Sequence, residues 1–181
     1  MNIYDFKVKA RDGSEVALAD YKGKVVLVVN TATGCGFTPQ YSDLQKIYEA
    51  YHKDGLEILD FPCNQFAEQA PGTDEEIHTF CTGRFGIAFP QFSKIDVNGE
   101  QAIPLYKWLT EHTTFGGFDL SHPIGPILND MLKKEDPDYE KNSSIKWNFT
   151  KFLMNRQGEL VQRFEPTDSL EKVENKIKEL L

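Results

Sequence analysis

The apolar positions of the chain follow two periods, one typical of strands and one typical of helices. Two continuous runs of β-branched and aliphatic residues, KVVLVVN at 24–30 and LEILDF at 56–61, interrupt more polar sequence. Such runs are typical of strands that lie in the middle of a sheet with both faces covered. The sequence therefore predicts a sheet whose centre is built from these two segments.

Segments in which apolar and polar residues alternate predict three further β elements. The segment 6–18 reads as a small hairpin with a two-residue turn at Asp12-Gly13. A strand is expected over 92–99, and a second hairpin over 150–164 around Gln157-Gly158.

Helical spacing appears first over residues 39–54, directly after the first buried run. Thr38 is expected to cap this helix, Pro39 to occupy its first position and Gly55 to follow its end. The apolar residues that share one face of it are Tyr41, Leu44, Ile47, Tyr48 and Tyr51.

Three more segments carry helix signals. A capping box from Thr73 to Glu76 opens a helix that is expected to stop near Gly83. IPLYKWLTEH at 103–112 predicts another helix, and the chain closes with one over 169–181. The closing helix places four apolar side chains on one face: Leu170, Val173, Ile177 and Leu180.

The segment 113–144 is the least regular part of the chain. It is rich in glycine, proline and charge, and predicts a long surface excursion with one or two helical turns near PILNDMLKK. The remaining order is strand, helix, strand, helix, hairpin, helix. This order predicts an α/β fold of the thioredoxin-like type, with a central mixed sheet flanked by helices and an N-terminal hairpin.

The composition narrows the class of protein. With 181 residues, of which 40% are hydrophobic, residues 1–181 are expected to form one domain with a substantial core. A net charge of −8 argues against binding to nucleic acid or to an anionic membrane. No apolar run approaches the roughly 18 residues of a membrane span, and the first residues lack the apolar stretch of a signal peptide. A cytoplasmic location is therefore expected.

The chain has three cysteines, Cys35, Cys63 and Cys81, and none lies in a C-x-x-C motif. In a reducing compartment such thiols are expected to stay free of structural disulfides. His78 and Cys81 share helical spacing, but two more ligands of a zinc site are not evident, so no metal is expected.

Cys35 lies on the turn between a buried strand and a helix start. Unpaired N–H groups and the helix dipole favour an anion there, so we expect a thiol pKa of about 5–7 and a nucleophilic thiolate. The residue three positions later is Thr38, so the dithiol of a thioredoxin is missing. The local stretch alone fits a small buried apolar cysteine equally well.

A cluster of amides follows the second buried run, in LDFPCNQFAEQAPG at 59–72. Neutral amides such as those of Asn64, Gln65 and Gln69 donate hydrogen bonds without giving up a proton, which suits a thiolate. Asn64 and Gln65 fit equally well as residues that hold the loop together. Cys63 has no helix start beside it and is interpreted as a structural thiol.

Three motifs, NTATGCGFTPQY at 30–41, FPCNQFAEQAPG at 61–72 and WNFTKFL at 147–153, resemble the signatures of glutathione peroxidases in the same order. The resemblance runs over most of the chain and implies reduction of hydroperoxides without a metal or a bound cofactor. It implies that Cys35 is the peroxidatic residue and that Gln69, Trp147 and Asn148 are its hydrogen-bonding partners. The best-known members carry selenocysteine where Cys35 stands, so slower turnover is implied.

The resemblance also assigns a role to Cys81, which matches the resolving cysteine of the non-selenium subgroup. It implies a cycle in which Cys35 becomes a sulfenic acid, Cys81 forms a disulfide with it, and thioredoxin or a similar dithiol reduces the pair. A place in the last turn of the second helix would help Cys81 to move. A buried structural role for Cys81 remains an alternative.

Two other functions stay open. In one, glutathione reduces Cys35 directly and Cys81 takes no part; in the other, the protein is a redox sensor that oxidises a partner protein. The segment 113–144 has two possible roles as well, since it either narrows access to the site or forms a contact in a homo-oligomer.

Overall fold

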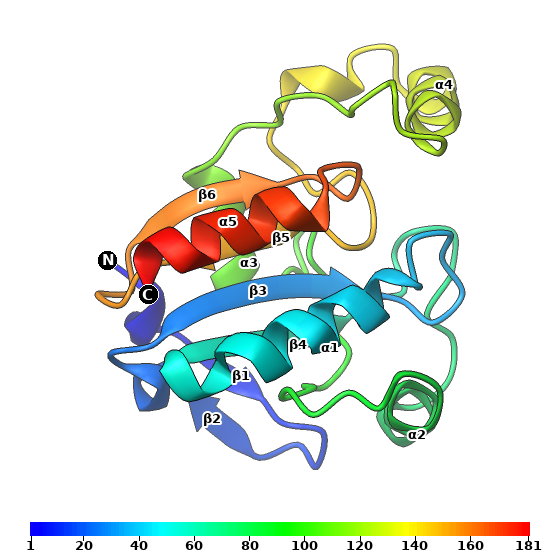
Figure 1. The fold of residues 1–181 in the computed structure, drawn as a ribbon. Coiled ribbons are helices and arrows are strands. Elements are labelled where there is room, and N and C mark those ends of the chain that lie inside the picture. The colour runs from blue at the N-terminus through cyan, green and yellow to red at the C-terminus, as the bar shows by residue number, and fades with distance from the viewer.

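A mixed four-stranded sheet in the order β4-β3-β5-β6 forms the centre of the fold (Figure 1). The computed structural model describes residues 1–181. β4 runs parallel to β3, whereas β5 runs antiparallel to both β3 and β6. The four strands are β3 (Val25–Thr31), β4 (Leu56–Pro62), β5 (Lys151–Met154) and β6 (Leu160–Phe164).

Helices cover both faces of this sheet. Figure 1 shows α1 (Gln40–Tyr51) and α5 (Leu170–Leu180) side by side on one face, with α3 (Pro104–Glu111) behind the other. The helices α2 (Asp74–Phe85) and α4 (Gly125–Glu135) lie beyond the end of the sheet at which β3 terminates. This layered arrangement confirms the predicted α/β class.

A separate two-stranded sheet lies at the N-terminal side, as expected. It consists of β1 (Lys7–Lys9) and β2 (Glu15–Ala17), paired antiparallel. Four 3₁₀ helices complete the chain: η1 (Ile3–Asp5), η2 (Leu18–Tyr21), η3 (His52–Asp54) and η4 (Tyr139–Lys141).

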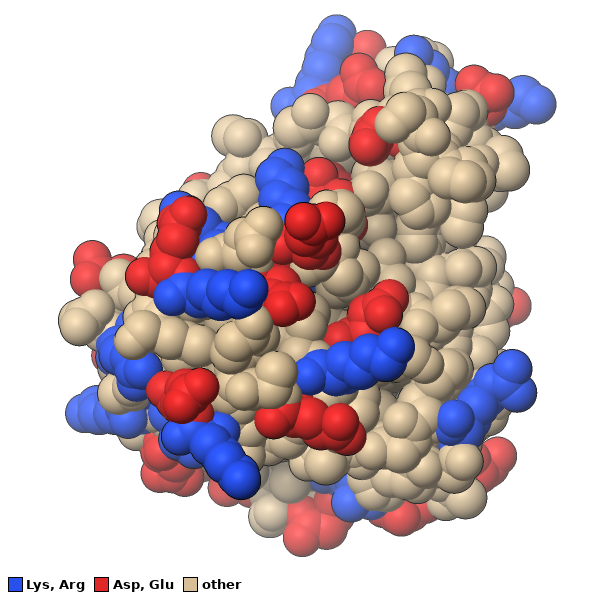
Figure 2. Space-filling view, viewed as in Figure 1, with Lys and Arg blue, Asp and Glu red and all other residues tan.

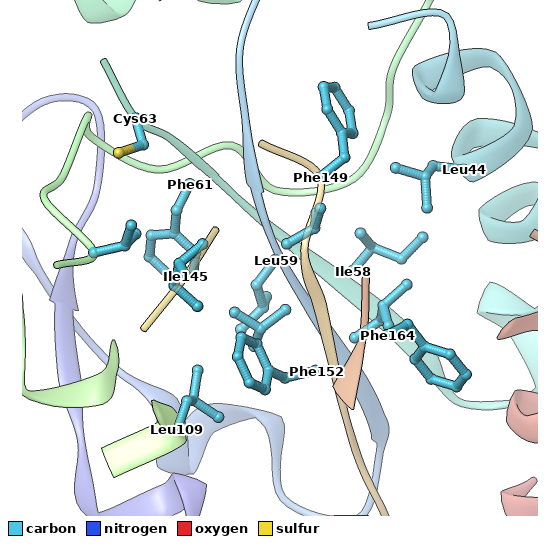
Figure 3. Packing of buried hydrophobic residues seen from close by; sticks show 14 of the residues in the cluster. Leu44, Ile58, Leu59, Phe61, Cys63, Leu109, Ile145, Phe149, Phe152 and Phe164 are labelled. Atoms are coloured by element: carbon cyan, nitrogen blue, oxygen red, sulfur yellow. The ribbon is translucent and has the colours of Figure 1, made fainter. Parts of the chain in front are cut away.

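The core lies on both sides of the sheet and forms one cluster of 45 buried residues. Because side chains alternate along a strand, Ile58 on β4 faces Leu44 of α1 while Phe61 faces α3 (Figure 3). The Phe61 and Phe152 rings meet Tyr106 of α3 edge to face, with ring centroids 6.2 Å and 6.0 Å away. Every residue of β3 and β4 is buried, which explains the continuous apolar runs.

Two β predictions need correction. The first hairpin has a three-residue loop, since Ala10 N–H bonds Ser14 O at 2.8 Å and Gly13 takes a positive φ of 85°. The segment 92–99 is not a strand, although single bridges place Gln91 beside Asp60 and Phe92 beside Ala10. Some backbone N–H groups of this segment bond to β4 and others to the N-terminal hairpin, so it forms no continuous ladder of hydrogen bonds with either.

The helix boundaries also differ from the sequence pattern. α1 begins at Gln40, and the Thr38 hydroxyl serves the preceding loop rather than the helix as a cap. α2 continues past Gly83 to Phe85 and ends at Gly86, whose φ is 62°. α4 has 11 residues, so it is longer than the one or two turns expected.

The surface carries interspersed acidic and basic side chains over α1 and α5, and few charges where β3 ends (Figure 2). None of the helices combines the length and the apolar character needed to cross a bilayer.

The closing helix α5 allows a test of the core. Ile177 is fully buried, whereas its neighbour Lys178 is exposed. Ile177→Ala is expected to lower the free energy of unfolding by about 2–5 kcal/mol, because it removes buried methyl groups and leaves a cavity. Lys178→Ala is the matched control and is expected to change it by less than about 0.5 kcal/mol in urea unfolding. Equal effects of the two variants would contradict the docking of α5 described above.

Candidate active site

Three loops meet at one edge of the sheet, and the strand directions explain why. β3 and β4 are parallel, so the chain that follows each of them leaves at the same edge. β5 is antiparallel to β3, so the chain that precedes β5 arrives at this edge as well. Cys35 follows β3, Gln69 follows β4, and Trp147 and Asn148 precede β5. The fold therefore brings together the residues that the sequence motifs single out.

The Cys35 side chain lies in a pocket of hydrogen-bond donors and is only 7% exposed. The backbone N–H of Phe37 donates to its sulfur at 3.3 Å. The side chains of Trp147 and Asn148 lie close enough to the sulfur to lower the pKa of the thiol. The Thr38 hydroxyl fixes the loop, since it accepts from Cys35 N at 3.0 Å and donates to Ala32 O at 2.8 Å.

Burial nevertheless raises the pKa of the Cys35 thiol, so the expected depression to about 5–7 is wrong for this structure. Loss of water around the sulfur is the largest effect, and the hydrogen bonds from Phe37, Trp147 and Asn148 oppose it without reversing it. The first turn of α1 starts five residues after Cys35, so the helix dipole acts from further away than the sequence suggested.

The amide of Asn148 joins two of the three loops. It is fully buried, and its Nδ2 donates to Gln69 Oε1 at 3.1 Å as well as facing the Cys35 sulfur. Gln69 thus reaches the sulfur through Asn148, and its own Nε2 is left free for a ligand. Asn148 Oδ1 is buried without a hydrogen-bond partner. An orphaned acceptor beside a thiol is a feature that a bound O–H group would satisfy.

Backbone strain is concentrated beside these amides. The only non-glycine residues with positive φ are Ala67 (54°), Glu68 (52°) and Phe149 (65°), which lie within two residues of Gln69 or Asn148. Left-handed backbone at such residues costs about 1–2 kcal/mol each, and such strain gathers at functional sites. The sequence gives no signal for it, because none of the three residues is a glycine or an asparagine.

Two buried polar residues, which lie within the motifs but were not singled out as site residues, hold the strained segment in place. Asn30 of β3 accepts the N–H of Phe149 on its carbonyl at 2.6 Å and donates its amide to Trp147 O at 3.3 Å. Lys151 Nζ donates to Phe149 O and to Gln40 Oε1, both at 2.7 Å. Complete burial lowers the pKa of Lys151 to about 7. Both residues therefore position Asn148.

The loop that carries Gln69 passes close to the loop that carries Cys35. Gly34 N–H donates to Gln69 O at 2.8 Å, and a Cβ at position 34 would lie 3.3 Å from that oxygen. Glycine at this position permits the close approach. The two loops are thus joined by backbone as well as by side chains.

Asn64, Gln65 and Cys63 are structural in this fold. Asn64 Oδ1 accepts the N–H of Ala70 at 3.0 Å, and Gln65 Oε1 accepts the N–H of Val97 at 2.7 Å. Cys63 is fully buried, and this burial raises its thiol pKa to about 11. Of the amides in this loop, only Gln69 faces the site.

Cys81 lies apart from the donor set. It is fully buried on α2 near the side chains of Tyr41 and Gln91, and burial together with the nearby Asp60 raises its thiol pKa to about 11. All three cysteines are free thiols. Since α2 continues one turn beyond Cys81, its expected place in the last turn is wrong.

A cleft of about 340 Å³ lies beside Trp147, between the Gln69 loop and the segment 131–146. Its apolar lining includes Phe66, Met131, Leu132 and Tyr139. Arg163 of β6 anchors the far wall by donating to Ser143 O at 2.5 Å and Ser144 O at 3.0 Å. The long excursion therefore forms one wall of a cleft that shares Trp147 with the candidate site but is not lined by Cys35, Gln69 or Asn148.

Comparison with known proteins places these features in a family. The family model described as glutathione peroxidase matches residues 3–110. A glutathione peroxidase of Lactococcus lactis is 45% identical, with all of both chains covered. A hydroperoxy fatty acid reductase of Synechocystis is 44% identical, covering 99% of this chain and 95% of the relative.

Solved structures agree with the fold. The crystal structure of T. cruzi GPX1 aligns with a TM-score of 0.70 at 34% identity, covering 99% of this chain and 96% of the other. A thioredoxin family protein of Chlorobium tepidum aligns with a TM-score of 0.58 at 15% identity, covering 97% and 92%. At that identity the likeness concerns the fold alone, which is thioredoxin-like as predicted.

The pKa directions predict how the thiols react with iodoacetamide. Cys35 is expected to react first, because Cys63 and Cys81 are fully buried with pKa values of about 11. Its rate is expected to rise about tenfold per pH unit through pH 8, since the raised pKa leaves the thiolate a minority form. Peptide mapping by mass spectrometry measures both rates. A Cys35 rate that levels off below about pH 7, or faster labelling of Cys63, would contradict this prediction.

Proposed function

The chain belongs to the glutathione peroxidase family of oxidoreductases, and we propose that it is a thiol peroxidase in which Cys35 attacks the hydroperoxide. The observation that carries this proposal is the convergence of Trp147, Asn148 and the Phe37 N–H on the Cys35 sulfur. No base is required at the site, because one proton passes from the thiol to the leaving oxygen.

The proposed first step balances without a cofactor. The Cys35 thiolate attacks the outer oxygen of the hydroperoxide, an S–O bond forms, and the O–O bond breaks. The electron pair leaves on the inner oxygen, which takes up the proton released by the thiol and departs as water or an alcohol. Cys35 becomes a sulfenic acid.

The amides are suited to hold the peroxide in this step. Gln69 Nε2 is free to donate to the leaving oxygen, whose negative charge grows as the O–O bond breaks. Asn148 Oδ1, which has no partner in the resting protein, accepts the terminal O–H of the hydroperoxide. The Gln69 contact stabilises the growing charge and the Asn148 contact orients the hydroperoxide, and neither side chain transfers a proton of its own.

The cleft beside Trp147 is suited to the organic part of the substrate. It shares Trp147 with the catalytic donors and adds apolar side chains, including Phe66 and Leu132. A related protein is named a hydroperoxy fatty acid reductase. We therefore propose organic hydroperoxides as substrates beside hydrogen peroxide, with access shaped by the segment 131–146 rather than by a subunit contact.

We propose that Cys81 resolves the sulfenic acid and that a dithiol such as thioredoxin reduces the resulting disulfide. Cys81 attacks the Cys35 sulfur, an S–S bond forms, and water leaves with the sulfenic oxygen. In this structure Cys81 has partners different from those of Cys35, so α2 must open first. The shortest opening unwinds the end of α2, where Gly83 lowers the helical preference.

We infer that one domain, residues 1–181, carries this activity in a reducing compartment such as the cytoplasm. Three free cysteines fit such a compartment. Reduction of Cys35 by glutathione and oxidation of a partner protein are the alternatives that the experiments below distinguish.

Variants at the two amides test the donor set. Asn148→Ala and Gln69→Ala are each expected to slow oxidation of Cys35 by peroxide about tenfold or more, since each lost hydrogen bond to a charged partner is worth about 1.5–3 kcal/mol. Stopped-flow tryptophan fluorescence measures the rate. Gln157→Ala, in the distant hairpin turn, is the matched control and is expected to react like the wild type. If all three variants react equally fast, the amides are structural.

Cys81→Ser tests the resolving role. It is expected to abolish turnover with thioredoxin while the first oxidation of Cys35 stays within about twofold of the wild type. Peptide mapping after one equivalent of hydrogen peroxide is expected to find a Cys35–Cys81 disulfide in the wild type. Cys63→Ser is the control and is expected to retain turnover. Full activity of Cys81→Ser with glutathione would favour the glutathione-dependent alternative, and a trapped mixed disulfide with a cellular protein would favour the sensor.

A further inference from the structure

A buried carboxyl group lies beneath α2. Asp60 of β4 is fully buried and accepts hydrogen bonds from the hydroxyl of Thr31, from the Tyr41 hydroxyl at 2.9 Å and from Gln91 Nε2 at 2.9 Å. All three donors are uncharged, and no cationic side chain pairs with Asp60. A buried carboxyl group without a counter-ion is costly to ionise, so its presence calls for an explanation.

Two of the three donors of Asp60 also neighbour Cys81. The side chains of Tyr41 and Gln91 lie close enough to the Cys81 thiol to affect its pKa. Gln91 in turn pairs through Oε1 with His78 Nδ1 at 2.9 Å, one turn earlier on α2. The carboxyl group and the proposed resolving thiol therefore share one hydrogen-bond network.

The backbone after α2 closes over the same group. Asp60 N–H donates to Pro90 O at 3.0 Å, and Phe92 N–H donates to Asp60 O at 2.8 Å. Movement of α2 or of the segment 86–92 therefore exposes Asp60 to water. The titratable groups near it are Tyr41 from α1 and His78 and Cys81 from α2, whereas Tyr106 of α3 lies on the other face of the sheet with Phe61.

We propose that Asp60 is a positioning residue for the resolving step, and that its carboxylate form favours the opening of α2 that releases Cys81. This inference rests on the proposed role of Cys81. Asp60 touches neither the peroxide nor the sulfur of Cys35. It acts through Tyr41 and Gln91, which hold α2 closed.

The direction of the pH effect follows from burial. Burial raises the pKa of Asp60 to about 6 in the closed protein, and opening to water returns it toward about 3.9. A group with the higher pKa in the closed state stabilises that state when protonated. The closed state is therefore weakened as pH rises through about 6. These two pKa values correspond to an open population about tenfold larger at pH 7.5 than at pH 5.

The test compares the wild type with Asp60→Asn, which keeps the size of the side chain but cannot ionise. Formation of the Cys35–Cys81 disulfide after one equivalent of hydrogen peroxide is timed by acid quench and mass spectrometry from about pH 5 to 7.5. The ratio of wild-type to variant rates is expected to rise about tenfold over this range. Oxidation of Cys35 is expected to stay within about twofold.

Two further variants make the test specific. Tyr41→Phe removes one hydrogen-bond donor to Asp60, so the rate of disulfide formation is expected to rise at higher pH than in the wild type. This variant tests the proposal if Asp60→Asn does not fold. Asp130→Asn, at an exposed position, is the matched control and is expected to leave the rates unchanged. A ratio of wild-type to Asp60→Asn rates that stays constant with pH overturns the proposal.

Failure of the proposed function has a different signature. If the wild type forms no Cys35–Cys81 disulfide, the resolving role of Cys81 is wrong. Hydrogen exchange of residues 76–85 in the reduced protein then tests whether ionisation of Asp60 controls the opening of α2, independently of any disulfide. The ratio of exchange rates between wild type and Asp60→Asn is still expected to rise with pH, and a constant ratio overturns the inference.

Discussion

The antiparallel pairing of β5 with β3 is the constraint on which the candidate site depends. Its register places Lys151 opposite Val29, so the turn before β5 lies over the end of β3. The hydrogen bond from Phe149 N–H to Asn30 O, at 2.6 Å, continues this contact into the turn. Trp147 and Asn148 are thereby held over the loop of Cys35. A slip of one residue would turn Asn148 away, because successive side chains point to opposite faces.

Burial strengthens the hydrogen bonds to the Cys35 sulfur but makes the thiol harder to ionise. It excludes water, so each hydrogen bond to sulfur is stronger than it would be at the surface. It also raises the pKa of Cys35, since a thiolate loses more hydration than a thiol. Donors without charge lessen this cost but do not remove it. The arrangement favours a transition state in which negative charge is shared between the sulfur and the leaving oxygen over a resting thiolate.

The fold was largely predictable from the sequence because the main elements bury one face or both. The runs at 24–30 and 56–61 became β3 and β4, and the closing helix buries Val173 and Ile177 as expected. The segment 92–99 alternates like a strand, but tertiary contacts decide where its hydrogen bonds go. The end of α2 was misplaced because Gly83 is tolerated within a helix, and the left-handed residue that ends it is Gly86.

The site was predictable only in part. The motifs named Cys35, Gln69, Trp147 and Asn148, and the structure brings all four together. Local pattern could not show the strain at Glu68, since a left-handed glutamate has no sequence signature.

The buried polar residues were harder to foresee. A lysine within an alternating hairpin strand is ordinarily assigned to the exposed face, whereas Lys151 is fully buried. Its amine is satisfied by Gln40 and Phe149, residues remote from one another in the sequence. The sequence likewise places Asn30 at the end of a buried strand, whereas in the structure its carbonyl and amide hydrogen-bond to the turn before β5. Such roles depend on partners that only the fold supplies.

The burial of Cys81 links the proposed cycle to local stability. A resolving thiol at the surface could react at once, whereas in the proposed cycle Cys81 reacts only after α2 moves away from Tyr41 and Gln91. Partial opening of a helix end costs less than global unfolding, because most of the core stays packed. The 45-residue core lies mainly between the sheet, α1, α3 and α5, and α2 contributes only Ile77 and Cys81 as buried residues. Helix α2 is therefore the element that can open while the sheet and the donors around Cys35 stay in place.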